Sequence, residues 1–271
     1  MIVSRIILKN WRNFQSVDVP LQDRVFLIGP SACGKSHWLD VFRFLRDLAQ
    51  EGGGLQKAIY DRGGLSQMRC LSVPRTANIE IEVQLAKSAL PEPDWKYAIG
   101  ITQDIKENHP PCLAYERVWK GIEQIIDRPD SDDQKDPLRL TQTYLQQVNA
   151  NLAFREIAQF FEAVSYLHLV PQLVRHSQAF PGFNISGDPF GKYFLERVSK
   201  TPEITRQSRL NKIETGLRIA VPQLKHLTYT KGDTGTPHLQ VLCEHWKPGS
   251  QQREDQLSDG TLRLMGLLWA F

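Results

Sequence analysis

The chain of 271 residues contains no run of about 18 consecutive apolar residues, the length that a membrane-spanning helix requires. Its first residues, Met1 to Arg5, lead into an alternating pattern and not into the apolar stretch of a secretory signal peptide. From these two absences we expect a cytoplasmic protein with no membrane partner.

Cysteine is scarce, and its spacing excludes two common kinds of site. The four cysteines form no C-x-x-C pair, so the sequence predicts neither a zinc knuckle nor a disulfide framework. The seven histidines include no H-E-x-x-H pair, which excludes the common zinc-protease motif. The net charge of +3 is too small to diagnose nucleic-acid binding, although the 33 basic residues could gather on one face after folding. Composition therefore leaves the partner open.

A glycine-rich octet is the most specific motif in the sequence. It fits the phosphate-binding pattern G-x-x-x-x-G-K-[S/T] at every fixed position, and it reads Gly29, Pro30, Ser31, Ala32, Cys33, Gly34, Lys35, Ser36. The apolar run 25–28 precedes it and is predicted to be a buried strand. A helix is predicted after it, because apolar residues from Trp38 to Ala49 recur at steps of three and four.

Each residue type in the octet has a physical task in binding a nucleoside triphosphate. Gly29 and Gly34 let consecutive backbone N–H groups curl around phosphate oxygens at the start of a helix. Lys35 is predicted to hold the β- and γ-phosphates, and the Ser36 hydroxyl to complete the coordination of Mg²⁺. We interpret Cys33 as a small residue that is tolerated in the loop. The octet therefore predicts binding of ATP with Mg²⁺.

A second candidate anion site lies near residue 260, in the segment Leu257-Ser258-Asp259-Gly260-Thr261-Leu262-Arg263. Ser258 can cap a helix, and Gly260 allows a ligand to approach the backbone closely. Such a helix start is common when it occurs alone, but it is suited to a γ-phosphate that another molecule presents.

Together the two motifs resemble those of ABC-type ATPases, in particular the SMC/RecF/OLD-like branch of bacterial AAA family ATPases, which act in DNA repair and phage defence. Three further segments are similar to elements of that branch, namely Asn10 to Ser16, Arg62-Gly63-Gly64 and Gly187 to Gly191. The resemblance implies ATP and Mg²⁺ as cofactors and a homodimer that encloses two nucleotides. It also implies that Ser258 and Gly260 contact the nucleotide of the second copy. Arg12 would lie near the base or the phosphates, and a solvated turn residue is an equally good interpretation.

The sequence departs from this pattern after the second motif. The family continues with an apolar strand that ends in Asp-Glu, the Walker B element, and this sequence has no counterpart of it or of the catalytic glutamate. We expect the chain to be the N-terminal portion of a longer ATPase, or else a split subunit that another chain completes. The Q-loop glutamine stays open among three residues, Gln67, Gln84 and Gln103.

The expected fold is α/β, a P-loop NTPase of ABC-ATPase type. It has a mixed sheet around the P-loop helix, an antiparallel β subdomain and a helical insertion. Residues 1–126 would form the N-terminal ATPase lobe, 127–137 a mobile loop and 138–235 a helical subdomain. Residues 236–271 would return to the ATPase core with the signature motif, truncated before Walker B.

Two functions follow from these expectations. The first is an ATP-binding head that dimerises around ATP to control DNA or a partner nuclease. Hydrolysis of ATP is implied by resemblance alone. The alternative is a regulatory or scaffold subunit that binds the nucleotide without hydrolysing it, which the missing Walker B element favours.

Overall fold

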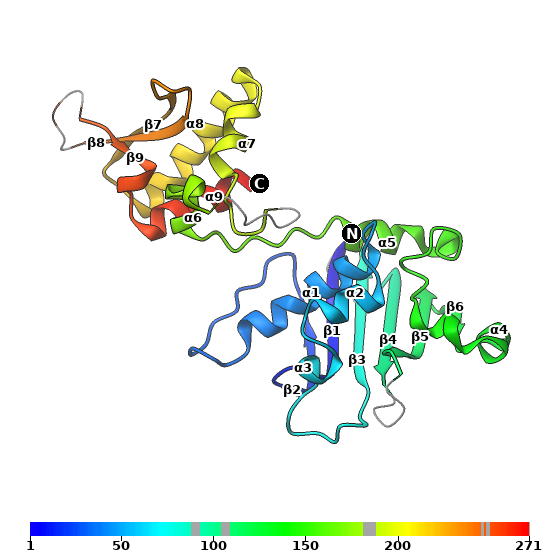
Figure 1. Cartoon of the computed structure of the whole chain (residues 1–271). Helices are drawn as coiled ribbons and strands as arrows, with labels where there is room; N and C mark the ends of the chain where they lie inside the picture. The colour runs from blue at the N-terminus through cyan, green and yellow to red at the C-terminus, as the bar shows by residue number, and fades with distance from the viewer. Residues whose placement is uncertain (88–92, 104–108, 181–187, 245–246, 248–249, 271) are drawn as a thin grey trace. The chain divides into compact units, whose positions relative to one another are not determined.

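The computed structural model describes residues 1–87, 93–103, 109–180, 188–244, 247 and 250–270. The chain divides into two compact units, Met1–Val164 and Ser165–Phe271 (Figure 1). No helix in the described part of the chain is long and apolar enough to cross a membrane.

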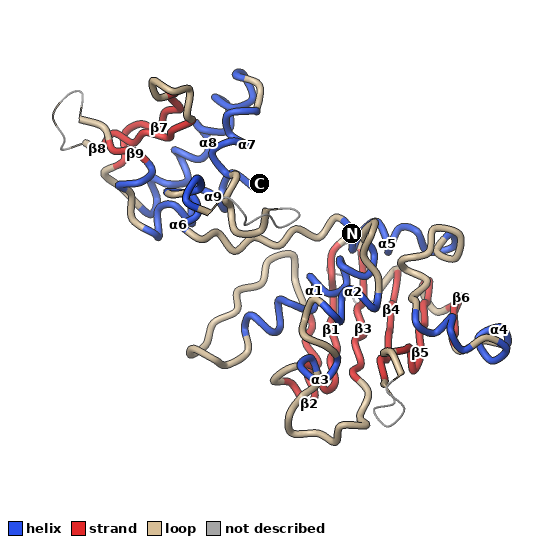
Figure 2. Tube along the Cα trace, viewed as in Figure 1, coloured by secondary structure: helices blue, strands red, loops and turns tan. Residues whose placement is uncertain are grey.

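The first unit is built on a six-stranded sheet in the order β2-β1-β3-β4-β5-β6, in which every neighbouring pair is antiparallel (Figure 2). The strands are β1 (Ile2–Trp11), β2 (Phe14–Pro20), β3 (Ile79–Ala86), β4 (Trp95–Thr102), β5 (Cys112–Lys120) and β6 (Glu123–Arg128). Alternate residues of β3 are fully buried because successive side chains of a strand point to opposite faces. The same alternation is visible in the sequence itself at residues 79–85 and 96–101, which lie in β3 and β4.

Five helices accompany this sheet, α1 (Lys35–Ala49), α2 (Leu55–Tyr60), α3 (Leu65–Met68), α4 (Ser131–Lys135) and α5 (Arg155–Glu162). The helix predicted after the octet is therefore confirmed as α1. Its buried face differs slightly from the prediction, because Val41 and Phe44 are fully buried whereas Leu39 is 41% exposed. The core of the unit forms between this face and the inner residues of the sheet.

The run 25–28 was predicted to be a buried strand, and this prediction is wrong. The segment is not assigned to any strand, and Phe26 and Ile28 are 84% and 94% exposed. A continuous apolar run is typical of a strand buried on both faces, but such a strand needs neighbours that accept its backbone hydrogen bonds. No described strand lies in register with these residues.

Residues 127–137, predicted to be a mobile loop, contain the end of β6 and the capped helix α4. Asp130 accepts hydrogen bonds from the backbone of Asp132 and Asp133 at 2.8 Å. Asp133 is itself buried, and both its oxygens accept from Arg128 at 2.9 Å. The polar composition of this segment thus serves a paired and buried cluster and not only a solvated surface.

The same guanidinium joins Asp133 to a second buried carboxylate. Arg128 Nη1 donates to Glu116 Oε2 at 2.9 Å, and Tyr97 donates its hydroxyl to Glu116 Oε1 at 2.9 Å. Burial is the largest single influence on Asp133 and acts to raise its pKa, but the hydrogen bonds from Arg128 and from the Asp130 backbone, together with the charges of Arg128 and Arg139, lower the pKa overall. At Glu116 burial dominates, so that its pKa is raised. We call Tyr97, Glu116, Arg128 and Asp133 the buried charge cluster.

The second unit combines a small antiparallel sheet, β7-β8-β9, with helices. Its elements are α6 (Pro171–Arg175), α7 (Phe194–Lys200), α8 (Glu203–Ala220), β7 (Leu224–Lys231), β8 (Pro237–Cys243), β9 (Gln252–Arg253) and α9 (Asp259–Ala270). Thr201 and Pro202 separate α7 from α8. A separate core lies between α8, α9 and the sheet.

The chain is therefore an α/β protein with a large antiparallel sheet and helices. A mixed sheet was expected around α1, but all strand pairs in the described ranges are antiparallel. The division after residue 164 also falls inside the stretch 138–235 that was predicted as one helical subdomain. That stretch holds β7 as well as helices, and 165–170 carries no strand.

Candidate phosphate-binding site

The octet adopts a backbone conformation that exposes its amide groups. Ala32 and Gly34 have positive φ angles of 64° and 100°, and Gly34 is the N-cap of α1. No described side chain caps the first turn of α1, so its N–H groups are left to a ligand or to water. At Gly29 a Cβ atom would lie 2.8 Å from Cys33 Sγ, so a larger residue there would require the Cys33 side chain to move. Left-handed residues before an uncapped helix N-terminus form a nest of N–H donors, an arrangement that binds anions.

Lys35 places its ammonium group over this nest. Its Nζ donates to the carbonyl oxygens of Gly29 and Pro30 at 2.8 and 2.6 Å, and it lies 3.6 Å from Cys33 Sγ. These bonds curl the side chain back over its own loop, where residues 29–33 are exposed. A phosphate that reaches the nest therefore meets a positive charge directly beside the amides.

The turn between β1 and β2 supports the loop from behind. Trp11 Nε1 donates to the His37 carbonyl at 2.8 Å, and the His37 ring lies 2.8 Å from Asn13 Oδ1 through its Nδ1. The ring of Phe14 packs so closely on Gly34 that a Cβ there would lie 3.0 Å from Phe14 Cζ. The first strand pair thus fixes where α1 begins.

Arg12 belongs to this supporting turn, and its side chain is turned toward α1 and α3. Its Nη1 donates to the Gln67 carbonyl at 2.8 Å, and its Nη2 lies 3.5 Å from Asp40. Asp40 is shared with Arg62, whose side chain is 5% exposed and which also pairs with Asp47 at 2.9 Å. Arg12 therefore joins the turn to α3 and α1 through these contacts. It is not the solvated turn residue of one of the two interpretations.

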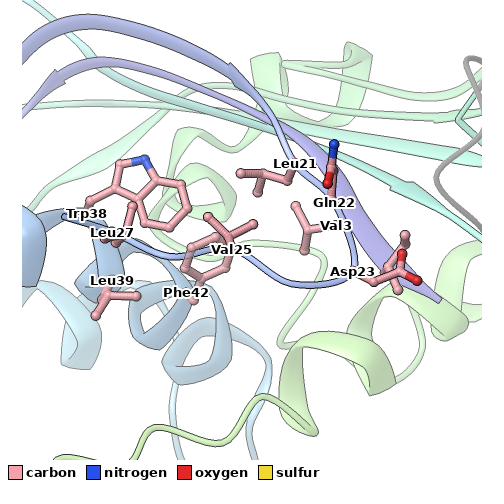
Figure 3. Close-up of a pocket in the computed structure, with 10 residues that line it drawn as sticks. Val3, Leu21, Gln22, Asp23, Val25, Leu27, Trp38, Leu39 and Phe42 are labelled. Carbon is pink, nitrogen blue, oxygen red and sulfur yellow. The ribbon is translucent and has the colours of Figure 1, made fainter.

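An apolar groove of about 320 Å³ lies beside the loop (Figure 3). Val25 and Leu27 line it together with Trp38 and Phe42 of α1, and Asp23 is the one charged residue of its lining. The close-up shows Leu27 beside Trp38 and Val25 beside Phe42. Because the groove has an apolar lining, it offers little to a phosphate, and the candidate phosphate site is confined to the nest.

Ser258 and Gly260 lie in the second unit, at the beginning of α9. The backbone N–H of Thr261 donates to Ser258 Oγ at 3.2 Å, so the predicted cap is confirmed. Ser258, Asp259 and Gly260 are exposed, and a Cβ on Gly260 would meet only Ser258 Oγ, at 3.9 Å. An anion can therefore approach this helix start without a steric obstacle.

The described residues offer no ready cage for a metal ion. No group of three or more His, Cys, Asp or Glu side chains lies close enough to hold one. Ser36, the predicted Mg²⁺ ligand, is exposed in the first turn of α1. Mg²⁺ commonly binds through one or two protein oxygens, nucleotide phosphates and water, so this donor set fits a nucleotide-borne Mg²⁺ and not a dedicated ion site.

The other segments of the resemblance occupy turns. Gly63 and Gly64 follow Arg62 with φ angles of 82° and 92°, which link α2 to α3. Asp188 and Gly191 also have positive φ angles in the turn before α7, and Gly187 lies outside the described residues.

A nest of amides with a lysine at a helix N-terminus is the arrangement of P-loop proteins. The profile of the AAA_21 family, described as "AAA domain, putative AbiEii toxin, Type IV TA system", matches residues 24–271. The chain therefore belongs to this family of AAA-type ATPase domains. The matched region includes the octet and the segment around Ser258.

Comparison with curated proteins found no match. Among solved structures, the chain is similar to the recombination mediator protein RecF with ATP, from the RecFOR pathway. The two share 12% identity with a TM-score of 0.34, over 98% of this chain and 78% of that chain.

Sequence reasoning missed two contacts that organise the site. Asn13 was noticed only as part of a resembling segment, and its bond to His37 has no signature in a single sequence. Arg175, which contacts Asp259 at 2.7 Å, was not considered, because 83 residues separate the partners and no periodic pattern connects them.

Proposed function

We propose that the chain is an ATP-binding head of the SMC/RecF/OLD-like type. It binds ATP with Mg²⁺ on residues 29–36 and dimerises around the nucleotide to control DNA or a partner nuclease, in DNA repair or phage defence. The observation that carries the proposal is the nest at the start of α1 with Lys35 above it.

The nest and Lys35 both contribute to binding of the triphosphate. The amides of the loop and of the first turn of α1 donate to phosphate oxygens along the helix axis, where the helix dipole is favourable. Lys35 exchanges its bonds to the loop carbonyls for bonds to phosphate, and Ser36 offers its hydroxyl to Mg²⁺. Mg²⁺ supplies charge neutralisation of the phosphates when it is bound.

Ser258 and Gly260 support the dimeric part of the proposal. They form a second exposed helix start with a hydroxyl at its cap, which suits a γ-phosphate held by another copy. A homodimer in which each copy contributes Ser258 to the partner's nucleotide uses both motifs. ATP is then the ligand that joins the two copies.

Titration with ATP and Mg²⁺ tests the binding site. Lys35→Ala is expected to lower the affinity at least about 100-fold, because a charged hydrogen-bonding group is lost from the phosphate site. Lys57→Ala is the matched control, since Lys57 pairs with Asp61 on the exposed face of α2. Equal affinities of the Lys35 variant and the wild type would refute the proposed site.

A regulatory or scaffold subunit that holds ATP without hydrolysing it is the second candidate. The sequence has no Walker B pattern, and the described residues contain no carboxylate cluster for a catalytic metal. Phosphate release by the purified 271-residue chain separates the two candidates. Turnover that Lys35→Ala abolishes would exclude the scaffold.

A further inference from the structure

The start of α9 is held by a side chain from a different helix. Arg175 ends α6, and its Nη1 lies 2.7 Å from Asp259 Oδ1. Its Nη2 donates to the Leu257 carbonyl at 2.6 Å. These contacts fall on the two residues that flank Ser258. The Arg175 side chain is 14% exposed, whereas the Asp259 side chain is 49% exposed, so the contact reaches from the interior to the surface beside Ser258.

The two contacts of Arg175 restrain the backbone on both sides of Ser258. Ser258 Oγ accepts from Thr261 N, and its own carbonyl accepts from Leu262 N at 3.1 Å. A capping hydroxyl points in a defined direction only if the residue before the helix is held. Leu257 is 8% exposed and packs in the core of the second unit, while Arg175 restrains its carbonyl. Arg175 thus completes the support of Ser258.

Charge gives Arg175 a second effect at this helix start. Asp259 lies between Ser258 and Gly260, and its carboxylate would repel a phosphate that approaches the same amides. Arg175 pairs with that carboxylate and neutralises it locally. The planar guanidinium can bond a carboxylate and a carbonyl at once, which a lysine ammonium does with less geometric restraint.

We propose that Arg175 is the positioning residue of the anion site at Ser258 and Gly260. It holds the backbone on both sides of Ser258 and prevents Asp259 from opposing a phosphate. This inference rests on the proposed function, in which the phosphate belongs to a nucleotide bound by a second copy. Arg175 itself acts through Leu257 and Asp259.

A merely structural link between α6 and α9 would behave differently when charge is restored. Arg175→Met removes both the hydrogen bonds and the compensating charge. Asp259→Asn in the same chain removes the uncompensated carboxylate but restores no bond to Leu257. The positioning account therefore predicts partial recovery of phosphate recognition in the double variant, whereas a structural link predicts a further loss of stability without recovery.

The experiment uses the full chain with ATP and Mg²⁺ and measures the dimer dissociation constant by sedimentation. Ser258→Ala establishes the dependence on the serine. Arg175→Met is expected to weaken the dimer about tenfold or more, since charged hydrogen bonds are lost. The dimer dissociation constant of Arg175→Lys should lie between those of the wild type and Arg175→Met. The double variant, Arg175→Met with Asp259→Asn, should dimerise about threefold or more tightly than Arg175→Met alone. The affinity of monomer for ATP should not change in any of them.

Arg197→Met is the matched control, because Arg197 pairs with Asp188 at 3.3 Å in the same unit and is 45% exposed. The inference is overturned if Ser258→Ala weakens the dimer and Arg175→Met does not, or if Asp259→Asn brings no recovery. If Ser258→Ala leaves the dimer intact, the dimeric part of the proposed function is contradicted as well. Should Arg175→Met unfold, Arg175→Lys takes its place: it keeps the charge but loses the paired contacts with Leu257 and Asp259, and an unchanged dimer dissociation constant would overturn the inference.

Discussion

Two polar regions of the first unit use charge in opposite ways. In the buried charge cluster, Arg128 is 1% exposed and its donors are bonded to Glu116, to Asp133 and to backbone carbonyls. In the phosphate loop, Lys35 donates to the carbonyl oxygens of Gly29 and Pro30 and lies 3.6 Å from Cys33 Sγ, and residues 29–33 are exposed. The comparison shows that the cluster has no capacity left for a ligand, whereas the loop has.

This difference separates structural charge from functional charge. A buried ion pair is costly to break, because the remaining partner is left desolvated and unpaired. Lys35 is partly buried on an exposed loop, and its bonds to carbonyls can be exchanged for bonds to phosphate. Substitutions should therefore change stability in the cluster and ligand affinity in the loop.

The largest effect on stability is expected from Arg128→Met. It leaves Glu116 and Asp133 buried without their cation, which should lower the free energy of unfolding by about 3–5 kcal/mol. Urea unfolding measures this change. Arg117→Met is the control, because Arg117 and Asp127 form an exposed pair, with side chains 44% and 60% exposed, and it should cost less than about 1 kcal/mol. Similar losses of unfolding free energy in both variants would contradict the distinction between the buried charge cluster and exposed charges.

The next largest effect is expected from Gly34→Ala, which should change both stability and ATP binding. An alanine at φ 100° costs about 1–2 kcal/mol, and its Cβ would also press on Phe14. We expect ATP affinity to fall about tenfold, since the nest is distorted. Gly52→Ala controls for the backbone, because Gly52 has a φ of 70° and open space around it. Equal ATP affinity in the two variants would contradict the account of the nest.

At low pH the buried charge cluster should lose stability. The pKa of Asp133 is lowered in the folded chain, so its contribution to stability is present above the unfolded pKa of about 3.9 and is lost as pH falls through the folded value. The pKa of Asp130 is also lowered, chiefly by the backbone hydrogen bond from Asp133. Between about pH 5 and about pH 2, the free energy of unfolding should fall more steeply for the wild type than for Asp133→Asn. An equal slope would contradict this prediction.

Titration of Glu116 changes stability in the opposite direction to that of Asp133 and over a higher pH range. Because its folded pKa is raised, stability declines as pH rises from the unfolded value of about 4.3 to the folded value, and is constant above it. Glu116→Gln should therefore flatten this part of the profile.

The smallest effect is expected from Asn13→Ala. It removes the contact with His37 at 2.8 Å and the bond to the Ala32 carbonyl at 3.4 Å, both partly exposed to water. A loss of about 0.5–1.5 kcal/mol is expected, together with a few-fold weaker binding of ATP. Gln124→Ala, which removes a 3.4 Å bond on exposed β6, should leave ATP binding unchanged. Unaltered binding in Asn13→Ala would show that the turn does not support the loop.

Local patterns in the sequence predicted much of this structure. The octet and the apolar spacing after it located the start of α1, because both signals come from neighbouring residues. The cap at Ser258 followed from the same kind of local chemistry. These features depend on the backbone of a few consecutive residues.

The failures concern contacts between distant residues. The run 25–28 has the composition of a buried strand, yet no described strand pairs with it. Within the polar segment 127–137, Arg128 pairs with Asp133 and also with Glu116 of β5, and no local pattern reveals the second contact. Arg175 and Asp259 are likewise joined only by the tertiary fold.

Hydrogen–deuterium exchange of the chain with and without ATP and Mg²⁺ tests the central claim most directly. The account predicts that ATP slows exchange in the peptide covering residues 29–37 and leaves the peptide covering 123–135 unchanged. Lys35→Ala should abolish the protection at the same ATP concentration. Binding of ATP with no protection of residues 29–37, or protection that persists in Lys35→Ala, would contradict the account.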